Sequence, residues 1–257
     1  VQTMLDPADC GPACIALCQD IQGQTFDYPE EFFKEKIHVI RRPRPDEFQI
    51  KEAAEKIKAS KKPILISGGG VFYSDAMDAL SKFAIKHNIP VTQTVMGYST
   101  MKRDHSHYAG QIGGLGGKNT NMLAKQTDLA IAVGTKLADF TTGSWANFEN
   151  EDFKLVSINV SRFDANKHLA QAVVGDARAS LNELSAALGD WKAPDEWNNK
   201  SQAELKSWNE HVDKESAPTN QEVPSYVQVV GAVYRNSDPS DIAVTAAGGL
   251  VGEVVQV

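Results

Sequence analysis

Two kinds of apolar pattern alternate along the middle of the chain, between residues 47 and 188. Continuous apolar runs of strand length predict β-strands that are buried on both faces. These runs are Ile64–Ser67, Ile89–Thr94, Leu129–Val133, Lys154–Val160 and Ala172–Val174. Between them, apolar residues recur every three to four positions, which predicts amphipathic helices. This alternation predicts an α/β domain built on a doubly wound, six-stranded parallel sheet.

The predicted helices of this domain have recognisable ends. They cover Glu47–Ala59, Ser74–His87, Thr120–Gln126 and Ala177–Leu188. Pro45-Asp46 predicts an N-terminal cap for the first of them. The spacing predicts these inward-facing positions in the first two helices: Ile50, Ala53, Ala54, Ile57, Met77, Leu80, Phe83 and Ala84.

The chain before this domain has a different character. Within residues 1–22, the apolar run Ala13–Cys18 predicts a buried strand, with Cys14 and Cys18 as small buried hydrophobic residues on one face. The proline pattern of residues 23–46 predicts an extended interdomain linker. We expect its aromatic residues to hold it against a neighbouring surface; they are Phe26, Tyr28, Phe32 and Phe33. Its basic run, Arg41 to Arg44, is open to two interpretations, a solvated linker or a small basic ligand site.

The chain after this domain also changes in composition. Residues 191–223 predict a charged surface helix over 194–214, followed by a second linker. Residues 224–257 predict an amphipathic helix up to Arg235 and a strand over Ile242–Thr245. This last piece has the pattern of the beginning of another α/β domain, so we expect partial flanking domains on both sides of the central one.

Composition and charge exclude several classes of protein. The 257 residues include 26 Lys and Arg against 33 Asp and Glu, which gives a formal net charge of −7. An acidic chain without a long basic run is a poor candidate for binding nucleic acid or an anionic membrane. No apolar run approaches the length of a membrane-spanning helix. Three Cys are too few for a disulfide framework, which favours a reducing, cytoplasmic location.

Glycine and small polar residues follow several of the predicted strands. Ligands of open parallel sheets bind at the carboxyl ends of strands, where glycine lets backbone amides come close to them. The candidate cofactor-binding or substrate-facing residues are Gly68, Gly69, Gly70, Gly113, Gly114, Thr141, Thr142, Ser144, Trp145 and Asn159. A tight strand-to-helix turn is an equally open interpretation for the first three, and a capping loop for the stretch from Asp139 to Trp145.

Recognisable catalytic and metal motifs are missing from the sequence. It contains no Gly-x-Ser-x-Gly elbow, no paired-carboxylate motif and no nucleophile with its base. His105 and His107 have a spacing that could suit a metal, but no third ligand is predictable nearby. Asp164 is predicted to cap a helix rather than to act as an acid. We therefore predict no catalytic and no metal-binding residue in this chain.

Several motifs are similar to those of thiamine-diphosphate enzymes. Gly11–Gln22 resembles the stretch that closes their N-terminal, pyrimidine-binding domain. Lys62–Val71 resembles the first strand and turn of their central domain, and Asp128–Thr135 a later strand of it. Thr245–Leu250 fits the opening of their third, diphosphate-binding domain. The resemblance implies domain limits at 1–22, 23–46, 47–190, 191–223 and 224–257.

Three further stretches are similar to one branch of these enzymes, the trihydroxycyclohexanedione hydrolases of myo-inositol catabolism. They are Asp139–Trp145, Phe163–His168 and, in the linker, Tyr28–Phe33. The resemblance implies hydrolysis of a carbon–carbon bond in a cyclic 1,2-diketone derived from a polyol, giving 5-deoxyglucuronate. It also implies thiamine diphosphate and Mg²⁺ as cofactors and a cytoplasmic homodimer or homotetramer.

The resemblance places the catalytic groups outside this chain. The activating Glu is expected before Val1 and the Gly-Asp-Gly metal motif after Val257, so the chain alone is expected to be inactive. Two alternatives remain open: a lyase or carboligase like acetolactate synthase, or a non-catalytic nucleotide-binding module. Because the flavin-binding form of the central domain uses the same triple-glycine turn, FAD or ADP is an alternative ligand. The expected partner is a small molecule, not a nucleic acid or a membrane.

Overall fold

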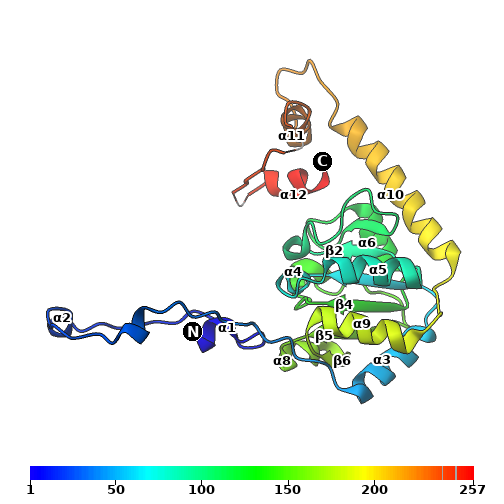
Figure 1. Cartoon of the computed structure of the whole chain (residues 1–257). Coiled ribbons are helices and arrows are strands. Elements are labelled where there is room, and N and C mark those ends of the chain that lie inside the picture. Colours follow the sequence, from blue (N-terminus) through cyan, green and yellow to red (C-terminus); the bar gives the residue numbers. More distant parts are fainter. Residues whose placement is uncertain (239, 247) are drawn as a thin grey trace.

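The computed structural model describes residues 1–238, 240–246 and 248–257. Within these residues, one six-stranded sheet has all its neighbouring strands parallel and the order β3-β2-β1-β4-β5-β6 (Figure 1). The strands are β1 (Pro63–Ser67), β2 (Val91–Gln93), β3 (Tyr108–Gln111), β4 (Leu129–Val133), β5 (Lys154–Asn159) and β6 (Gln171–Val174). This order is that of a doubly wound fold, and the predicted fold class is confirmed.

Helices cover the sheet and continue beyond it. The longer ones are α3 (Glu47–Lys58), α5 (Met77–His87), α9 (Ala177–Leu188), α10 (Asp195–Glu215) and α11 (Tyr226–Arg235). The shorter ones are α1 (Gln2–Leu5), α2 (Gln19–Gln22), α4 (Gly69–Tyr73), α6 (Lys118–Ala124), α7 (Asp139–Thr142), α8 (Arg162–Ala165) and α12 (Leu250–Gln256). Three 3₁₀ turns are η1 (Glu30–Phe33), η2 (Val95–Gly97) and η3 (Lys167–Leu169). None of the helices in the described ranges is long and apolar enough to span a membrane.

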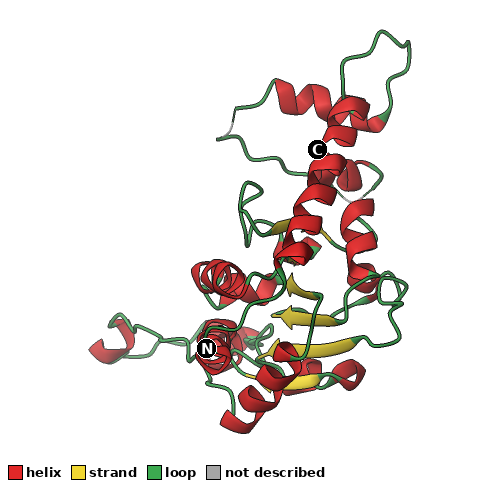
Figure 2. Ribbon diagram, turned by 90° about the vertical axis from the view of Figure 1, so that its right-hand side faces the viewer, coloured by secondary structure: helices red, strands yellow, loops and turns green. Residues whose placement is uncertain are grey.

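Two apolar cores lie on opposite faces of the sheet, with helices on either side of it (Figure 2). Alternate side chains of each strand belong to different cores, since successive side chains of a strand point to opposite faces of the sheet. Leu65 and Ile131 belong to the larger core, with apolar residues of α3, α5 and α9. Ile64 and Ala130 belong to the smaller core, with residues of α6 and Trp197 of α10. The strands are therefore buried on both faces, as their continuous apolar runs predict.

Residues 42 to 45 fasten the linker to the domain. The Arg42 guanidinium lies 3.1 Å from the Asp176 carboxylate, which is 4% exposed and also accepts the backbone N–H groups of Arg178 and Ala179. The Asp176 N–H donates to the Pro43 carbonyl, and Arg44 pairs with Glu183 on α9. Arg42 and Arg44 are thus paired with carboxylates of the domain, whereas Arg41 pairs with Asp6 of the N-terminal segment. The Arg41 and Arg44 side chains remain largely exposed, as in a solvated linker, but all three guanidinium groups are paired with carboxylates, so the run is not a free ligand site.

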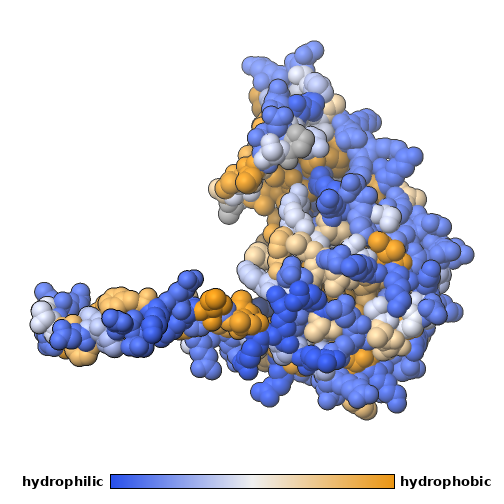
Figure 3. All heavy atoms as spheres, in the orientation of Figure 1, coloured by the Kyte–Doolittle hydropathy of each residue, from blue (hydrophilic) through white to orange (hydrophobic). Residues whose placement is uncertain are grey.

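Residues 1–41 form an arm that leaves the domain, runs out to α2 and returns (Figure 1). Hydrophobic patches alternate with hydrophilic stretches along it in Figure 3, and Ile15, Phe33 and Ile37 are more than two-thirds exposed. The linker aromatics pack on one another, with the Tyr28 and Phe32 rings 5.0 Å apart, and remain exposed instead of holding the linker against a neighbouring surface.

Two predicted strands are wrong. Residues 13–18 and 242–245 are irregular and exposed, and Cys14 and Cys18 are exposed free thiols instead of buried residues. Among the described residues no strand pairs with either run, and an unpaired strand leaves its backbone hydrogen-bonding groups unsatisfied. An apolar run alone is therefore insufficient to form a strand here.

The predicted helix over 74–87 begins later, at Met77, and a separate short helix, α4, lies before it. α4 begins at Gly69, and the chain bends before α5 because Asp75 has a left-handed φ of 50° and Ala76 is not helical. Met77 at the start of α5 is 37% exposed, whereas Leu80, Phe83 and Ala84 are buried as predicted. The other three predicted helices agree with α3, α6 and α9 to within about two residues.

The cap of α9 provides a test of the linker attachment. Asp176→Ala removes both the cap and the ion pair with Arg42, so we expect a loss of about 2–3 kcal/mol in the free energy of unfolding. Asp46→Ala is the matched control, since exposed Asp46 caps α3 through Phe48 and Gln49, and no ion pair is recorded for it among the described residues. The control should lose about 1 kcal/mol in urea unfolding. Equal losses would show that the ion pair contributes nothing.

Buried His87 makes stability depend on pH. Its Nδ1 donates to the Trp191 carbonyl at 2.8 Å, which leaves Nε2 to accept from the Ser185 hydroxyl at 2.9 Å. Burial lowers the pKa of His87, and the charges of Lys86 and Lys192 lower it further. Below about pH 6.5, His87 therefore binds a proton more readily in the unfolded chain than in the folded one. The free energy of unfolding consequently decreases as the pH falls.

Urea unfolding between about pH 7.5 and pH 5 measures this dependence. His105, His107 and His168 have pKa values lowered by burial and contribute in the same direction. We expect His87→Gln to lower the free energy of unfolding at neutral pH. It should also reduce the slope of that free energy against pH. An unchanged slope would mean that His87 titrates alike in both states.

Candidate functional site

The carboxyl ends of the strands form the edge at which this fold places ligands. Strand order reverses between β1 and β4, which pair over their full length from Pro63 with Leu129 to Ser67 with Val133. Gly68–Gly70 follows β1 and Gly134 follows β4. The first group of predicted site residues therefore lies at the switch point of the sheet.

These glycines bring two backbone turns into direct contact. The Gly68 N–H donates to the Val133 carbonyl and the Gly70 N–H to the Gly134 carbonyl, both at 2.9 Å. A Cβ atom at position 68 would lie 2.6 Å from Thr135 Cβ, and one at position 70 would lie 2.6 Å from Gly134 Cα. The structure thus shows the tight turn, and close backbone packing alone requires glycine at 68 and 70.

The second glycine group, Gly113 and Gly114, packs on α7. The Gly114 N–H donates to the Phe140 carbonyl at 2.7 Å, and Gly113 has a φ of 106°. The Asn121 amide accepts from the Gly113 N–H at 2.9 Å and donates to its carbonyl at 3.0 Å. This loop is therefore held between α6 and α7 by its backbone groups.

The predicted stretch from Thr141 to Trp145 leaves α7 in an uncommon conformation. Gly143, Ser144 and Trp145 have successive φ values of 59°, 51° and 70°. Thr142 is buried, and its hydroxyl accepts from the Trp145 N–H at 3.3 Å, whereas Ser144 is exposed. Because Ser144 and Trp145 are not glycine, their left-handed conformation costs free energy, and such strain is typical of functional loops.

The indole of Trp145 lies against His168, with 4.4 Å between ring centroids. His168 is itself left-handed, and burial together with Lys167 lowers its pKa, while Asp139 acts in the opposite direction. Asn159 at the end of β5 donates to the Thr135 carbonyl at 3.2 Å, so it joins the turns after β4 and β5. Ser161, not Asp164 as predicted, caps α8, because its hydroxyl accepts the Asp164 N–H.

A row of polar side chains at this edge was not predicted. Ser67, Gln93 and Gln111 end β1, β2 and β3, are in register with one another and are only 0%, 1% and 4% exposed. Ser67 and Gln93 point to the face of the larger core, as Leu65 and Val91 two residues earlier do. A register shift between β2 and β3 brings Gln111 opposite Gln93. The signal in the sequence was one polar residue at the end of each apolar run, and β3 itself was missed within the glycine-rich stretch.

Two members of this row have hydrogen-bond partners and the third has none. Ser67 Oγ and Thr100 Oγ1 are 2.7 Å apart, and Gln93 Nε2 donates to the Met101 carbonyl at 2.9 Å. Neither amide atom of Gln111 has a partner among the described residues. The row is therefore a buried hydrogen-bonding surface with one free amide.

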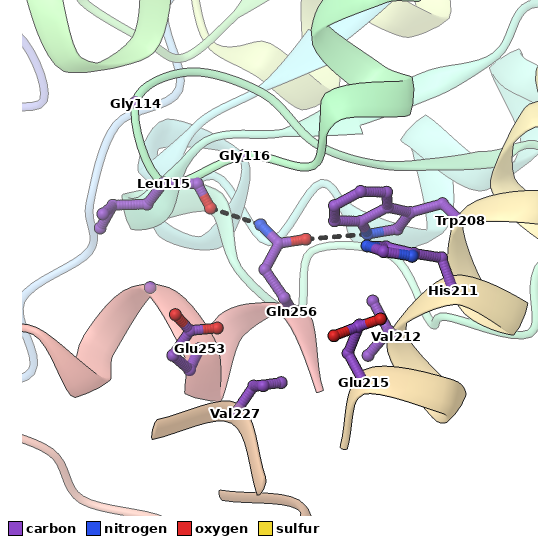
Figure 4. Close-up of a pocket in the computed structure, with 11 residues that line it drawn as sticks. Gly114, Leu115, Gly116, Trp208, His211, Val212, Glu215, Val227, Glu253 and Gln256 are labelled. Carbon is purple, nitrogen blue, oxygen red and sulfur yellow. Dashed lines mark hydrogen bonds between the residues drawn. The ribbon is translucent and has the colours of Figure 1, made fainter. Parts of the chain in front are cut away.

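A pocket of about 340 Å³ lies between the glycine-rich loop and the helices α10, α11 and α12 (Figure 4). Gln256 of α12 reaches between Leu115 and Trp208, donating to the Leu115 carbonyl at 2.5 Å and accepting from the indole N–H at 3.0 Å. Of the predicted site residues, only Gly114 lines this pocket. Gly113 lies beside Gly114 in the loop after β3, and the others lie along the turns after β1, β4 and β5.

The histidine pair at 105 and 107 is engaged within the domain. His105 Nε2 lies 2.9 Å from the Ser81 hydroxyl, and His107 Nε2 lies 3.1 Å from the Asn88 amide oxygen. Across the described ranges, no group of three or more His, Cys, Asp or Glu side chains is placed to hold a metal ion.

Comparisons with known proteins agree with this architecture. The family described as "Thiamine pyrophosphate enzyme, central domain" matches residues 50–184, more than half of the chain and most of the sheet. The chain belongs to this family.

Several relatives of this chain share the name 3D-(3,5/4)-trihydroxycyclohexane-1,2-dione hydrolase. The protein of Clostridium perfringens strain 13 is 45% identical over 188 residues, 73% of this chain and 29% of the relative. That of Geobacillus thermodenitrificans is 36% identical over 260 residues, 99% of this chain and 40% of the relative. That of Lacticaseibacillus casei is 33% identical over 285 residues, 100% of this chain and 43% of the relative.

The chain thus spans less than half the length of these curated relatives. The family implies thiamine diphosphate, whose diphosphate is usually held through a divalent cation. Since the described residues form no metal-ligand cluster, they do not fit that part of the cofactor.

Gly113 provides a test of the loop packing in this thiamine pyrophosphate enzyme domain. A Cβ atom there would collide with the Phe140 carbonyl and would also require a left-handed φ. We expect Gly113→Ala to lower the free energy of unfolding by about 3 kcal/mol or more. Gly189→Ala is the control, because Gly189 is left-handed but has nothing within 4 Å. It should cost about 1 kcal/mol in urea unfolding, and equal losses would contradict the packing argument.

Proposed function

We propose that the complete protein is a thiamine-diphosphate-dependent hydrolase of trihydroxycyclohexane-1,2-dione in inositol catabolism. It would cleave a carbon–carbon bond of this cyclic diketone and release 5-deoxyglucuronate. The observation that carries the proposal is the identity of 33–36% with hydrolases of this name over essentially the entire chain. Thiamine diphosphate, when bound, supplies the electron sink that cleavage of a carbon–carbon bond beside a carbonyl requires.

We further propose a division of the chain among three domains of the complete enzyme. Residues 1–22 would end the pyrimidine-binding domain, 47–190 would form the central domain and 224–257 would open the diphosphate-binding domain. Residues 23–46 and 191–223 would connect them. The paired Arg42 and Asp176 support the first connection, since they fasten the linker just before α3.

In this arrangement the carboxyl edge of the central sheet would face the cofactor and the substrate. Gly69, Gly113, Gly114, Thr141, Thr142, Ser144, Trp145 and Asn159 lie along the turns of that edge. Gly68 and Gly70 would act indirectly, by holding the turns after β1 and β4 together. The strained backbone of Ser144 and Trp145 supports this role, because such strain is concentrated at functional sites.

The finer features of the holoenzyme are also proposals. Mg²⁺ would be held by the diphosphate-binding domain outside this chain, and the enzyme would be a cytoplasmic homodimer or homotetramer. Its partner would be the small diketone rather than a nucleic acid or a membrane. The net charge of −7 supports the exclusion of nucleic acid.

Turnover by the complete protein tests the proposal. With thiamine diphosphate and Mg²⁺, it should consume the cyclic diketone and release the ring-opened acid, detected by mass spectrometry. The 257-residue chain alone should give no turnover, since we place the catalytic groups in the missing domains. Turnover by the chain alone would contradict this division, and condensation of pyruvate without diketone hydrolysis would favour the acetolactate-synthase alternative.

Calorimetry tests the nucleotide-binding alternative. The chain is titrated with ADP and with FAD, and we expect no heat of binding at micromolar concentrations. Micromolar binding of either ligand would favour a nucleotide-binding module at the Gly68–Gly70 turn.

A further inference from the structure

Among the described residues, Ser180, Asn198 and Ser201 each have one buried side-chain atom without a hydrogen-bond partner, and Gln111 has two. The Gln111 side chain is 4% exposed, yet both amide atoms lack a hydrogen-bond partner among the described residues. Buried polar groups in native proteins are nearly always paired, because an unpaired one loses its hydrogen bonds to water. A group left unpaired in the free protein therefore requires an explanation.

The register partner of Gln111 shows that this position can be satisfied. Gln93 lies beside it on β2, has the same side chain and the same burial, and donates to Met101 and Thr100. Ser67, next in the row, is paired with Thr100. Only the outermost member of the row, on the edge strand β3, has a free donor and a free acceptor.

Glycines lie on both sides of Gln111, and the loop after it returns to the strand. Gly110 and Gly113, on either side of it, have φ values of 96° and 106°. The loop that follows folds back on the strand, where the Gly117 N–H donates to the Gln111 carbonyl at 3.1 Å. Glycines with such φ values are the positions at which a loop can change direction at low cost.

We propose that Gln111 is a specificity-determining residue whose amide binds a polyhydroxylated cyclic ketone at the carboxyl edge of the sheet. This inference rests on the proposed function. An amide donates through Nε2 and accepts through Oε1. A ring carbonyl beside a hydroxyl offers the complementary acceptor and donor, so one such ligand satisfies both free atoms. A site with a buried polar partner also rejects analogues that lack the matching group.

A substitution that removes the amide separates this role from a structural one. Gln111→Met keeps the length of the side chain and removes two unpaired polar atoms, so we expect the melting temperature of the chain to rise by about 2–6 °C. Gln93→Met is the matched control on the adjacent strand, and it should lower the melting temperature because it breaks existing hydrogen bonds. A fall for Gln111→Met as large as that for Gln93→Met would overturn the proposal.

Binding is measured with 2-keto-myo-inositol, a stable cyclic polyhydroxyketone, and with cyclohexanone as a ring without hydroxyls. The first compound should raise the melting temperature of the unmodified chain in a concentration-dependent way, and of Gln93→Met by a similar increment. It should leave Gln111→Met unchanged, and cyclohexanone should shift none of them. Equal shifts for the unmodified chain and Gln111→Met, or none for either, would overturn the proposal.

In the complete enzyme, Gln111→Met should raise the KM for the diketone about tenfold or more and change kcat less. An unchanged KM would overturn the inference for the natural substrate. If the unmodified complete enzyme failed to hydrolyse the diketone, the proposed function would be wrong. The shift with 2-keto-myo-inositol would still decide the role of Gln111, because it is measured without turnover.

Discussion

The direct contact of two backbone turns, one after β1 and one after β4, holds the carboxyl edge of the sheet together. At this point the chain reverses the order in which it adds strands, so β1 and β4 are neighbours in the sheet although they are not consecutive in the chain. The Gly70 N–H and the Gly134 carbonyl make the connection between the two turns, at a distance that side chains would prevent. From there, Asn159 extends the connection to β5 through the Thr135 carbonyl. The predicted site residues after β1, β4 and β5 depend on this chain of contacts for their relative positions.

Much of the central domain could be predicted from the sequence because its signals are local. Helix α9 begins and ends where predicted, since Asp176 caps it and left-handed Gly189 ends it. The strand β4 has its predicted limits because it is a continuous apolar run that neighbours bury on both faces. By contrast, residues 13–18 and 242–245 have apolar runs of similar quality and remain irregular. A strand needs a partner strand, and the pattern of one segment does not indicate whether that partner is present.

The candidate site could be predicted only in part, for the same physical reason. Positions 68, 70 and 113 are glycine because a close backbone approach allows no other residue, but the sequence does not distinguish a ligand from a second turn as the approaching group. Ser67, Gln93 and Gln111 were missed because each lies at the end of a different strand, far from the other two in the sequence. Their common feature is the register of three parallel strands, which comes from pairing between distant segments. The strain at Trp145 and His168 is likewise visible only in the backbone.

The arm formed by residues 1–41 has a consequence for the behaviour of the chain at high concentration. Its apolar side chains, among them Ile15, Ile37 and Val39, are more than four-fifths exposed, whereas those of the domain lie mostly in two cores. Exposed apolar segments drive self-association, and the drive increases with concentration. Because Arg42 fastens the chain immediately after the arm, the domain does not depend on the arm for its own packing. The arm therefore sets the tendency of the chain to self-associate, whereas the domain sets its folding stability. The ion pair of Arg42 with Asp176 lies where these two parts meet.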